Sequence, residues 1–163
     1  VEVENVSKVG AGSYTKVAGR NFNTDTGVEG RVQVNVTFAG VALDADGNVV
    51  YVHIDTAQNQ GTFDGEGMIV AAEAIPTKKE RGDAYGMKVR SEIGKEWYEQ
   101  IAALEEWMIG KTVTAIKAVP VKVVDDAHQN VPDTPDLNTS VTITIEAYLG
   151  ATDTAAKNAI AIP

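Results

Sequence analysis

Two alternating stretches joined by a turn are the feature that most constrains the fold of this chain. Apolar and polar residues alternate over residues 32–38 and again over residues 50–54, which is the pattern of a half-buried strand. Between them, residues 44–48 have the sequence Asp-Ala-Asp-Gly-Asn, in which Gly47 can adopt a positive φ. We therefore predict an antiparallel hairpin. The buried face of its first strand would consist of Val32, Val34, Val36 and Phe38.

A second stripe has helical spacing. Steps of four, four, three and four residues place a set of large apolar side chains on one helix face. They are Ile93, Trp97, Ile101, Leu104 and Met108. Gly110 suits the position that follows a helix, and Lys111 favours its negative end. Together the two patterns predict an α+β fold, an antiparallel sheet with helices packed on one side, in which this stripe covers the Val32–Phe38 face.

The remaining segments give weaker patterns. We expect an edge strand at residues 1–4 and a turn at residues 10–13. Residues 14–30 are polar and punctuated by glycine, with a surface loop at residues 21–27, so that residues 1–30 form an irregular N-terminal extension of a single domain spanning 1–163. Further along, residues 68–73 and 121–124 are candidate strands. Residues 112–119 are a candidate short helix capped by Thr112, and residues 155–159 a weak terminal helix.

Composition excludes several classes of function. The formal charge of −9 argues against binding to nucleic acid or to anionic lipid, which both need a surface rich in Lys and Arg. The absence of cysteine excludes disulfides and thiolate chemistry. No apolar run is long enough to span a membrane. Because the chain begins at Val1 rather than Met, we expect a trimmed mature form, and a missing leader then says nothing about location.

Metal and hydrolase sites are not indicated. The acidic turn at residues 44–48 lacks the glutamate that a calcium loop needs at its twelfth position, which is Asp55 here. Asp125, Asp126 and His128 form the most metal-like cluster, but their spacing is better explained by turn chemistry. No nucleophile, base and acid occur in a recognisable order. We therefore expect no metal site and no catalytic site belonging to the protein itself.

The segment 136–148 concentrates hydroxyl side chains after a Pro-rich loop. Its alternation over residues 141–145 favours a strand, whereas a helix beginning there would offer free N–H groups to a phosphate. The run Asp136-x-x-Thr139-Ser140-Val141-Thr142 resembles the signature Asp-x-x-Ser-Gly-Ala-Thr of the FMN-binding domain family, which continues as a helix. In that family the last Thr can carry FMN through a phosphoester bond made by a flavin transferase. The resemblance thus implies a helix here, with Thr142 as the attachment residue.

Motifs in the middle of the chain resemble a subgroup of that family, the surface lipoproteins of Gram-positive-type bacteria. They are Thr77-Lys-Lys-Glu-Arg-Gly-Asp-Ala-Tyr-Gly-Met87 and Gly94-Lys-Glu-Trp-Tyr-Glu-Gln100. The resemblance covers about residues 31–158. It implies an FMN-binding-domain-like fold and an extracytoplasmic flavin-binding or electron-transfer module, tethered by a lipid anchor and served by a membrane or extracellular redox partner.

The resemblance and the residue types together give a set of candidate cofactor-binding residues. Tyr85 and Met87 are placed in it because they lie in a loop, where binding groups concentrate. The full set is Asp136, Thr139, Ser140, Thr142, Tyr85 and Met87. Trp97 is interpreted as a core anchor. The alternative is a cofactor-free surface module with a degenerate flavin site, since Ser140 and Val141 stand where the family has Gly and Ala.

Overall fold

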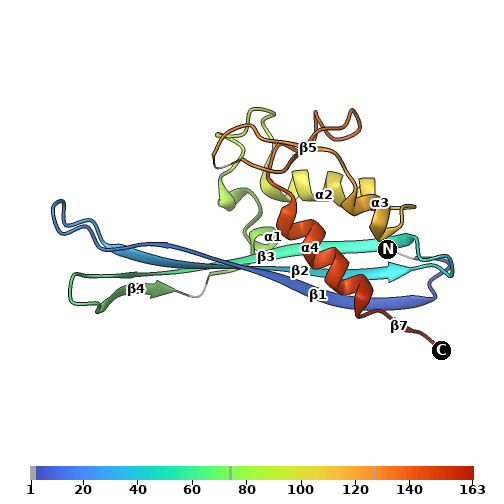
Figure 1. Ribbon diagram of the computed structural model, residues 1–163, viewed down its shortest axis with the longest axis horizontal. Coiled ribbons are helices and arrows are strands. Elements are labelled where there is room, and N and C mark those ends of the chain that lie inside the picture. The colour runs from blue at the N-terminus through green and yellow to red at the C-terminus, as the bar shows by residue number, and fades with distance from the viewer. Residues whose placement is uncertain (1–2, 74, 127) are drawn as a thin grey trace.

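A five-stranded antiparallel sheet forms the base of the molecule, with strand order β4-β3-β2-β1-β7 (Figure 1). The computed structural model describes residues 3–73, 75–126 and 128–163. The sheet consists of β1 (Lys8–Arg20), β2 (Gly30–Leu43), β3 (Val49–Phe63), β4 (Ile69–Glu73) and β7 (Ile160–Ala161). A small second sheet pairs β5 (Val121–Lys122) with β6 (Val131–Pro132).

The described helices lie on one side of this sheet (Figure 1). They are α1 (Lys78–Arg81), the 3-10 turn η1 (Gly82–Tyr85), α2 (Trp97–Met108), α3 (Val113–Lys117) and α4 (Glu146–Lys157). Helix α4 crosses β1 and β2, while α1 and α2 lie against β3. The predicted α+β class, with an antiparallel sheet and helices on one side, is confirmed. No described helix is both long enough and apolar enough to cross a membrane.

Each of the three long strands has one part that lies under the helices and one part that extends beyond them. The row Tyr14–Thr37–Thr56 marks the boundary between them. We call the part under the helices the covered half (residues 8–14, 37–43 and 49–56). The part that extends beyond them (residues 15–20, 30–36 and 57–63, with β4) is called the arm, and Figure 1 shows it at the left.

The hairpin is confirmed, but the face predicted to be buried is wrong. Val32 and Phe38 are almost half exposed, at 48% and 46%, whereas Thr37, Ala39 and Val41 of the opposite face are buried under the helices. The α2 stripe therefore packs with Ala39, Val41 and, from β3, Val52 and Ile54. The alternation over residues 32–36 lies in the arm, beyond the helices, so its apolar face does not show where the helices pack. The helix-side face becomes apolar only after Thr37, at Ala39 and Val41.

The irregular N-terminal extension is also wrong, because β1 runs from Lys8 to Arg20 and pairs along its whole length with β2. Residues 1–2 of the expected edge strand lie outside the described residues, and residues 3–4 are not in a strand. The glycines that indicated a turn are explained by packing. A Cβ on Gly10 would lie 2.1 Å from the Ala155 carbonyl oxygen, and one on Gly12 would lie 2.3 Å from the Ala155 nitrogen. Helix α4 can approach β1 this closely only over glycine.

Several local predictions are confirmed. The Asp44 carboxylate accepts hydrogen bonds from the backbone of Asp46 and Asn48, and Gly47 has φ of +84°. Thr112 caps α3 by accepting from the Ala115 N–H. The stripe of α2 is buried from Trp97 to Met108, although Ile93 lies in the preceding loop. Residues 160–161, for which the sequence predicted no strand, form β7 against β1.

Candidate functional site

A cavity of about 680 Å³ opens between four segments that are far apart in the sequence. Its walls come from the loop between Tyr85 and Ile93, from Gln100 of α2, from the β5–β6 hairpin, and from residues 138–143 before α4. The lining includes the basic side chains Arg90 and Lys122. It also includes the acidic side chains Glu92 and Asp125, with His128 beside them, so the wall carries charges of both signs.

Three of the six candidate cofactor-binding residues meet in this cavity. Tyr85 and Met87 line it from one side and Thr142 from another. The other three, Asp136, Thr139 and Ser140, are not among the described residues that line it. Asp136 and Thr139 are exposed in the turn after β6, and the Ser140 hydroxyl donates to the Leu137 carbonyl at 3.3 Å. Of the signature residues, Thr142 therefore lies in the cavity wall, whereas the three earlier ones lie in the preceding turn.

Residues 141–145 form neither the strand nor the helix considered from the sequence. Val141, Ile143 and Ile145 are all buried, so this segment crosses the core in an irregular path. The Ile145 N–H donates to the Asn130 carbonyl at 3.1 Å. This backbone group is thus paired with a distant segment and not through a helix or a strand. Helix α4 begins only at Glu146, and its N-cap Ile145 has no side-chain acceptor for the first N–H groups of the helix. The expectation that Thr142 lies at a helix N-terminus is therefore wrong.

Gln100 connects the two sides of the cavity. Its side chain is fully buried, and its Oε1 accepts from the Thr142 N–H at 2.9 Å and from the Thr142 hydroxyl at 3.3 Å. Its Nε2 lies 3.6 Å from Met87 Sδ and 3.3 Å from Ser91 Oγ. A buried amide of this kind is stable only when its donors and acceptor are paired. Gln100 therefore fixes Thr142 relative to Met87.

Sequence reasoning missed Gln100, although a signal was present. Position 100 lies three residues after Trp97 and four before Leu104, so it is on the buried side of the apolar stripe. A glutamine at such a position must find partners inside the protein. It would have indicated a buried polar contact, but not the identity of the partner.

Glu96 holds the loop that follows η1 and carries Met87. Its carboxylate is 2% exposed and accepts from the N–H groups of Met87 and Lys88, both at 2.9 Å. It also caps α2, in a reciprocal pair with Glu99. Burial alone would raise the pKa of the Glu96 carboxyl, but the backbone bonds from Lys88, Met87 and Trp97, with the Lys88 charge, outweigh it and lower the pKa. Glu96 is thus a buried anion that orders the loop.

Tyr85 is held among cations and aromatic rings. Lys78 Nζ lies 4.9 Å from the centre of its ring and the Arg81 guanidinium 5.0 Å from it, within cation–π distance. The Trp97 ring centre is 6.5 Å away. Trp97 itself is 1% exposed and donates from Nε1 to the Tyr148 hydroxyl at 2.8 Å. Its interpretation as a core anchor is confirmed, and it supports the cavity wall from behind.

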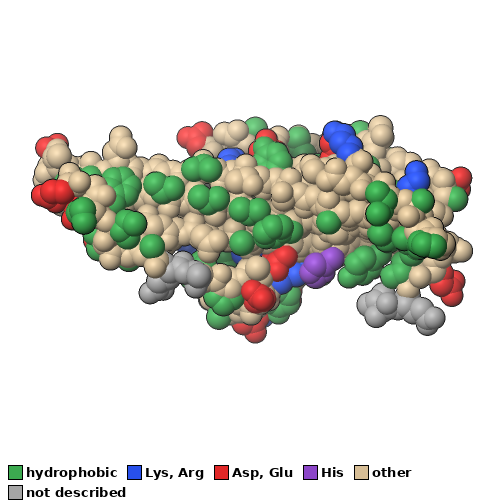
Figure 2. Space-filling view, turned by 90° about the horizontal axis from the view of Figure 1, so that it is seen from below, with side chains coloured by type: hydrophobic (Ala, Val, Ile, Leu, Met, Phe, Trp, Pro, Cys, Tyr) green, Lys and Arg blue, Asp and Glu red, His purple; other side chains and the backbone are tan. Residues whose placement is uncertain are grey.

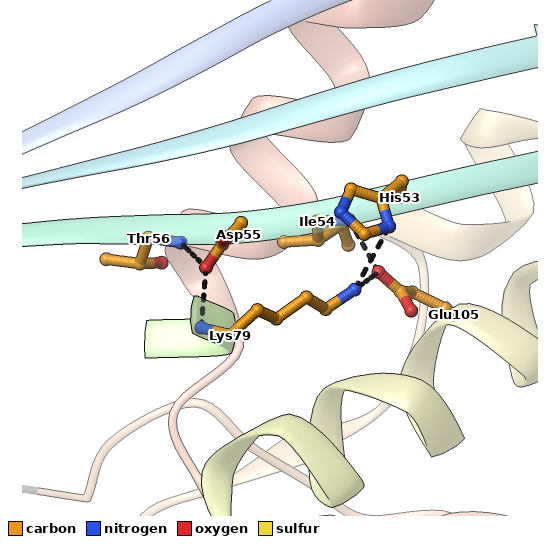
Figure 3. A network of polar contacts seen from close by, with 6 residues as sticks. All are labelled: His53, Ile54, Asp55, Thr56, Lys79 and Glu105. Atoms are coloured by element: carbon orange, nitrogen blue, oxygen red, sulfur yellow. Dashed lines mark hydrogen bonds and ion pairs between the residues drawn. The ribbon is translucent and has the colours of Figure 1, made fainter. Parts of the chain in front are cut away.

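Outside the cavity, a second polar cluster joins α1 and α2 to the free edge of β3 (Figure 3). Lys79 Nζ lies 2.6 Å from Glu105 Oε1 and 3.2 Å from His53 Nδ1. Glu105 also accepts from the Ile54 N–H, while Asp55 accepts from the Lys79 N–H at 3.0 Å. These bonds occupy an edge that β4 leaves unpaired, since β4 pairs only with residues 60–63 of β3. The cluster is explained by docking of α1.

The interpretation of residues 125–128 as turn chemistry agrees with the geometry. The His128 N–H donates to Asp125 Oδ1 at 2.8 Å, and His128 Nδ1 lies 2.9 Å from the same carboxylate. Within the described ranges, His, Asp and Glu side chains nowhere gather in groups of three or more that would hold a metal ion.

Comparison with known proteins gives one short similarity. A stretch of 41 residues, 25% of this chain, is 56% identical to part of a protein described as a chlorophenol reductase from Desulfitobacterium hafniense. That stretch covers 12% of the length of the reductase. No family model matches the chain, and no solved structure matches it.

Proposed function

We propose that this chain is an extracytoplasmic FMN-binding or electron-transfer module of a bacterial surface lipoprotein, with the cavity as its flavin site. The observation that carries the proposal is the meeting of Tyr85, Met87 and Thr142 around one cavity. The first two come from the middle motifs and the third from the C-terminal signature. If the two motifs resembled the family only by chance, there would be no reason for their residues to line the same cavity.

The chemistry of the lining fits a flavin nucleotide. A volume of about 680 Å³ lies inside the range of roughly 300–1,000 Å³ usual for small-molecule sites. The Tyr85 ring and the Met87 thioether offer apolar contact to a flat ring. Arg90 and Lys122 supply positive charge for a phosphate. The Thr142 hydroxyl supplies the oxygen that a phosphoester needs.

In this proposal the flavin, when bound, supplies redox chemistry that no side chain of the cavity can perform. The chain itself does three things. Thr142 anchors the phosphate, and Gln100 orients Thr142 through its N–H and hydroxyl. Glu96 keeps the loop with Met87 in place. The protein would therefore act as a carrier rather than as a catalyst with its own active site.

The partners and location follow from the resemblance. A flavin transferase would load the module, a lipid anchor would tether it outside the cell membrane, and a membrane or extracellular redox partner would exchange electrons with it. The 41-residue match covers only 12% of the chlorophenol reductase, so chlorophenol reduction is not part of the function proposed.

The test is co-expression with a flavin transferase, followed by intact mass spectrometry and an absorption spectrum in the visible flavin band. Wild-type protein should show a flavin spectrum and gain the mass of one FMN less one water, because the phosphoester forms with loss of the hydroxyl proton of Thr142 and of one hydroxyl from the phosphate. Thr142→Ala should abolish the adduct, because the bonded oxygen is gone. Thr144→Ala is the matched control, since this residue lies two positions away and does not line the cavity; its adduct should persist.

A second function, the cofactor-free surface module, is favoured by the path of residues 141–145. Thr142 does not lie at the helix N-terminus that would attract a phosphate, because α4 begins only at Glu146. The acidic side chain of Glu146 in the first turn of α4 would also repel a phosphate there. Wild-type protein that gains no adduct and binds no free FMN, while a related domain is labelled in parallel, would support this function. An adduct that survives Thr142→Ala would move the attachment site elsewhere.

A further inference from the structure

The sheet face turned away from the helices carries an unusual amount of exposed apolar surface. Figure 2 shows this face with hydrophobic side chains spread along it. Val17 is 66% exposed, and Val32 and Phe38 are each nearly half exposed. Val34 and Val36 lie between them on the same face of β2. Antiparallel sheets with one solvated face usually carry polar residues there.

This apolar face is nearly free of charge. Strand pairing places Val17, Val34 and Asn59 in one row, and Thr15, Val36 and Ala57 in the next. Among the residues of β1, β2 and β3 on this face, only His53 and Asp55 have acidic or basic side chains. Both lie at the β3 edge and are engaged by Lys79. The rest of the face is uncharged on a chain whose net charge is −9.

The size of the face is sufficient for a specific interface. The three strands are 13, 14 and 15 residues long. At roughly 3.3 Å per residue and about 4.8 Å between strands, they present on the order of 600 Å² per copy. Two such faces would bury on the order of 1,200 Å², which is the lower end of the range for stable protein–protein interfaces.

We propose that this face, from β1 to β3, is the interface of a homodimer in which two sheets pack face to face about a two-fold axis. Two equally twisted sheets pack with their strands about 30° apart and interdigitate their side chains. A two-fold interface uses the same surface on both copies, so the surface must be compatible with itself. A face whose central rows are uncharged meets that condition on a chain with net charge −9, whereas a charged face would bring like charges together.

Other occupants fit less well. An anionic lipid surface needs nearby Lys and Arg, whereas β1, β2 and β3 place neither on this face and the chain is acidic. A partner recognised through charge would find no complementary group over the central rows of β1 and β2. A second copy requires only what the face provides, which is a strand surface with β-branched side chains (Figure 2). The dimer would leave the cavity open, because the cavity is on the helix side.

Sedimentation velocity on the full chain across a wide dilution series tests the proposal. Wild-type protein should show twice the chain mass at high concentration and dissociate on dilution. Val36→Glu and Val36→Lys place a charge of either sign at the centre of the face, and each should give the monomer mass throughout. Val17→Glu should do the same at a site exposed enough to leave folding intact. Gln60→Glu is the matched control, because Gln60 is exposed on the other face of the same arm; it should remain dimeric.

A circular dichroism melt of each variant shows whether it is folded. Wild-type protein that stays monomeric at every concentration overturns the proposal. Dimerisation by Val36→Glu and Val17→Glu equal to that of wild type overturns it too. Monomeric wild type that binds neutral or anionic vesicles through Val17 would assign the face to a membrane instead. None of these outcomes depends on flavin binding, so the proposed function and the dimer fail separately.

Discussion

The covered half of the sheet and the arm are continuous strands, yet their helix-side faces differ sharply. Under the helices, β2 presents Thr37, Ala39 and Val41, all buried. In the arm the same face of the same strand presents Gln33 and Asn35, whose side chains bond to each other at 3.1 Å. The change from polar to apolar occurs where the helices begin. Composition along one strand face therefore shows how far its cover extends.

The opposite face shows no such change. Val32, Val34, Val36 and Phe38 continue from the arm into the boundary without a change in character. An alternating pattern thus identifies the strand in both halves. Only on the helix-side face, however, does the change from polar to apolar residues show where the helices pack. If this comparison is right, stability should depend strongly on helix-side positions in the covered half and weakly on positions elsewhere.

The largest effect is expected for Ile101→Ala. Ile101 is completely buried between α2 and the covered half, and removal of its side chain leaves a cavity, so the free energy of unfolding should fall by about 2–5 kcal/mol. Ile69→Ala in β4 of the arm is the control, because Ile69 is 75% exposed. Urea denaturation measures both. Equal losses would contradict the distinction between the two halves.

Glu96→Gln should follow in size, at roughly 1.5–3 kcal/mol near neutral pH, because it weakens charged hydrogen bonds to Met87 and Lys88. The folded-state pKa of Glu96 is below its ordinary value of 4.5. Its contribution to stability is therefore complete above that value and is lost as the pH falls through the lower, folded-state pKa. Denaturation at a series of pH values checks this: wild type and variant should converge in acid, and a constant difference would be inconsistent with an ionised Glu96.

A pair of glycine substitutions compares the two faces directly. Gly12→Ala would place its Cβ 2.3 Å from the Ala155 nitrogen of α4, so it should destabilise the fold by about 1–3 kcal/mol. Gly40→Ala, on the uncovered face, meets no described atom within 4 Å and should be neutral or stabilising by up to roughly 1 kcal/mol. Thermal melts at low protein concentration measure both. A harmless Gly12→Ala would contradict the close approach of α4.

The smallest effect is expected for Lys79→Met, which removes the partly exposed ion pair with Glu105. Its cost should stay below about 1 kcal/mol and should shrink as salt is added. Lys157→Met, at an exposed pair with Asp153, is the control and should have almost no effect. A large loss for Lys79→Met at high salt would mean that docking of α1 depends on more than this pair.

The candidate site was predictable only in its parts. The motifs identified Tyr85, Met87 and Thr142, and the cavity contains all three. Asp136 and Thr139 remain in an exposed turn, because the chain needs turn-forming side chains after Pro135 whatever binds nearby. Gln100 was missed because its partner Thr142 is 42 positions away, and no local pattern links the two.

What the sequence by itself determined is local. The Asp44–Asn48 turn, the Thr112 cap and the α2 stripe each depend on residues within a few positions of one another, so their chemistry is visible in the chain. The tertiary structure decided which sheet face is covered, why Gly10 and Gly12 belong to a strand, and how residues 141–145 cross the core. Each of these depends on contacts between distant segments. Such contacts outweigh local preference because burial of side chains such as Val141 and Ile145 stabilises the fold by more than strand or helix propensity differs at single positions.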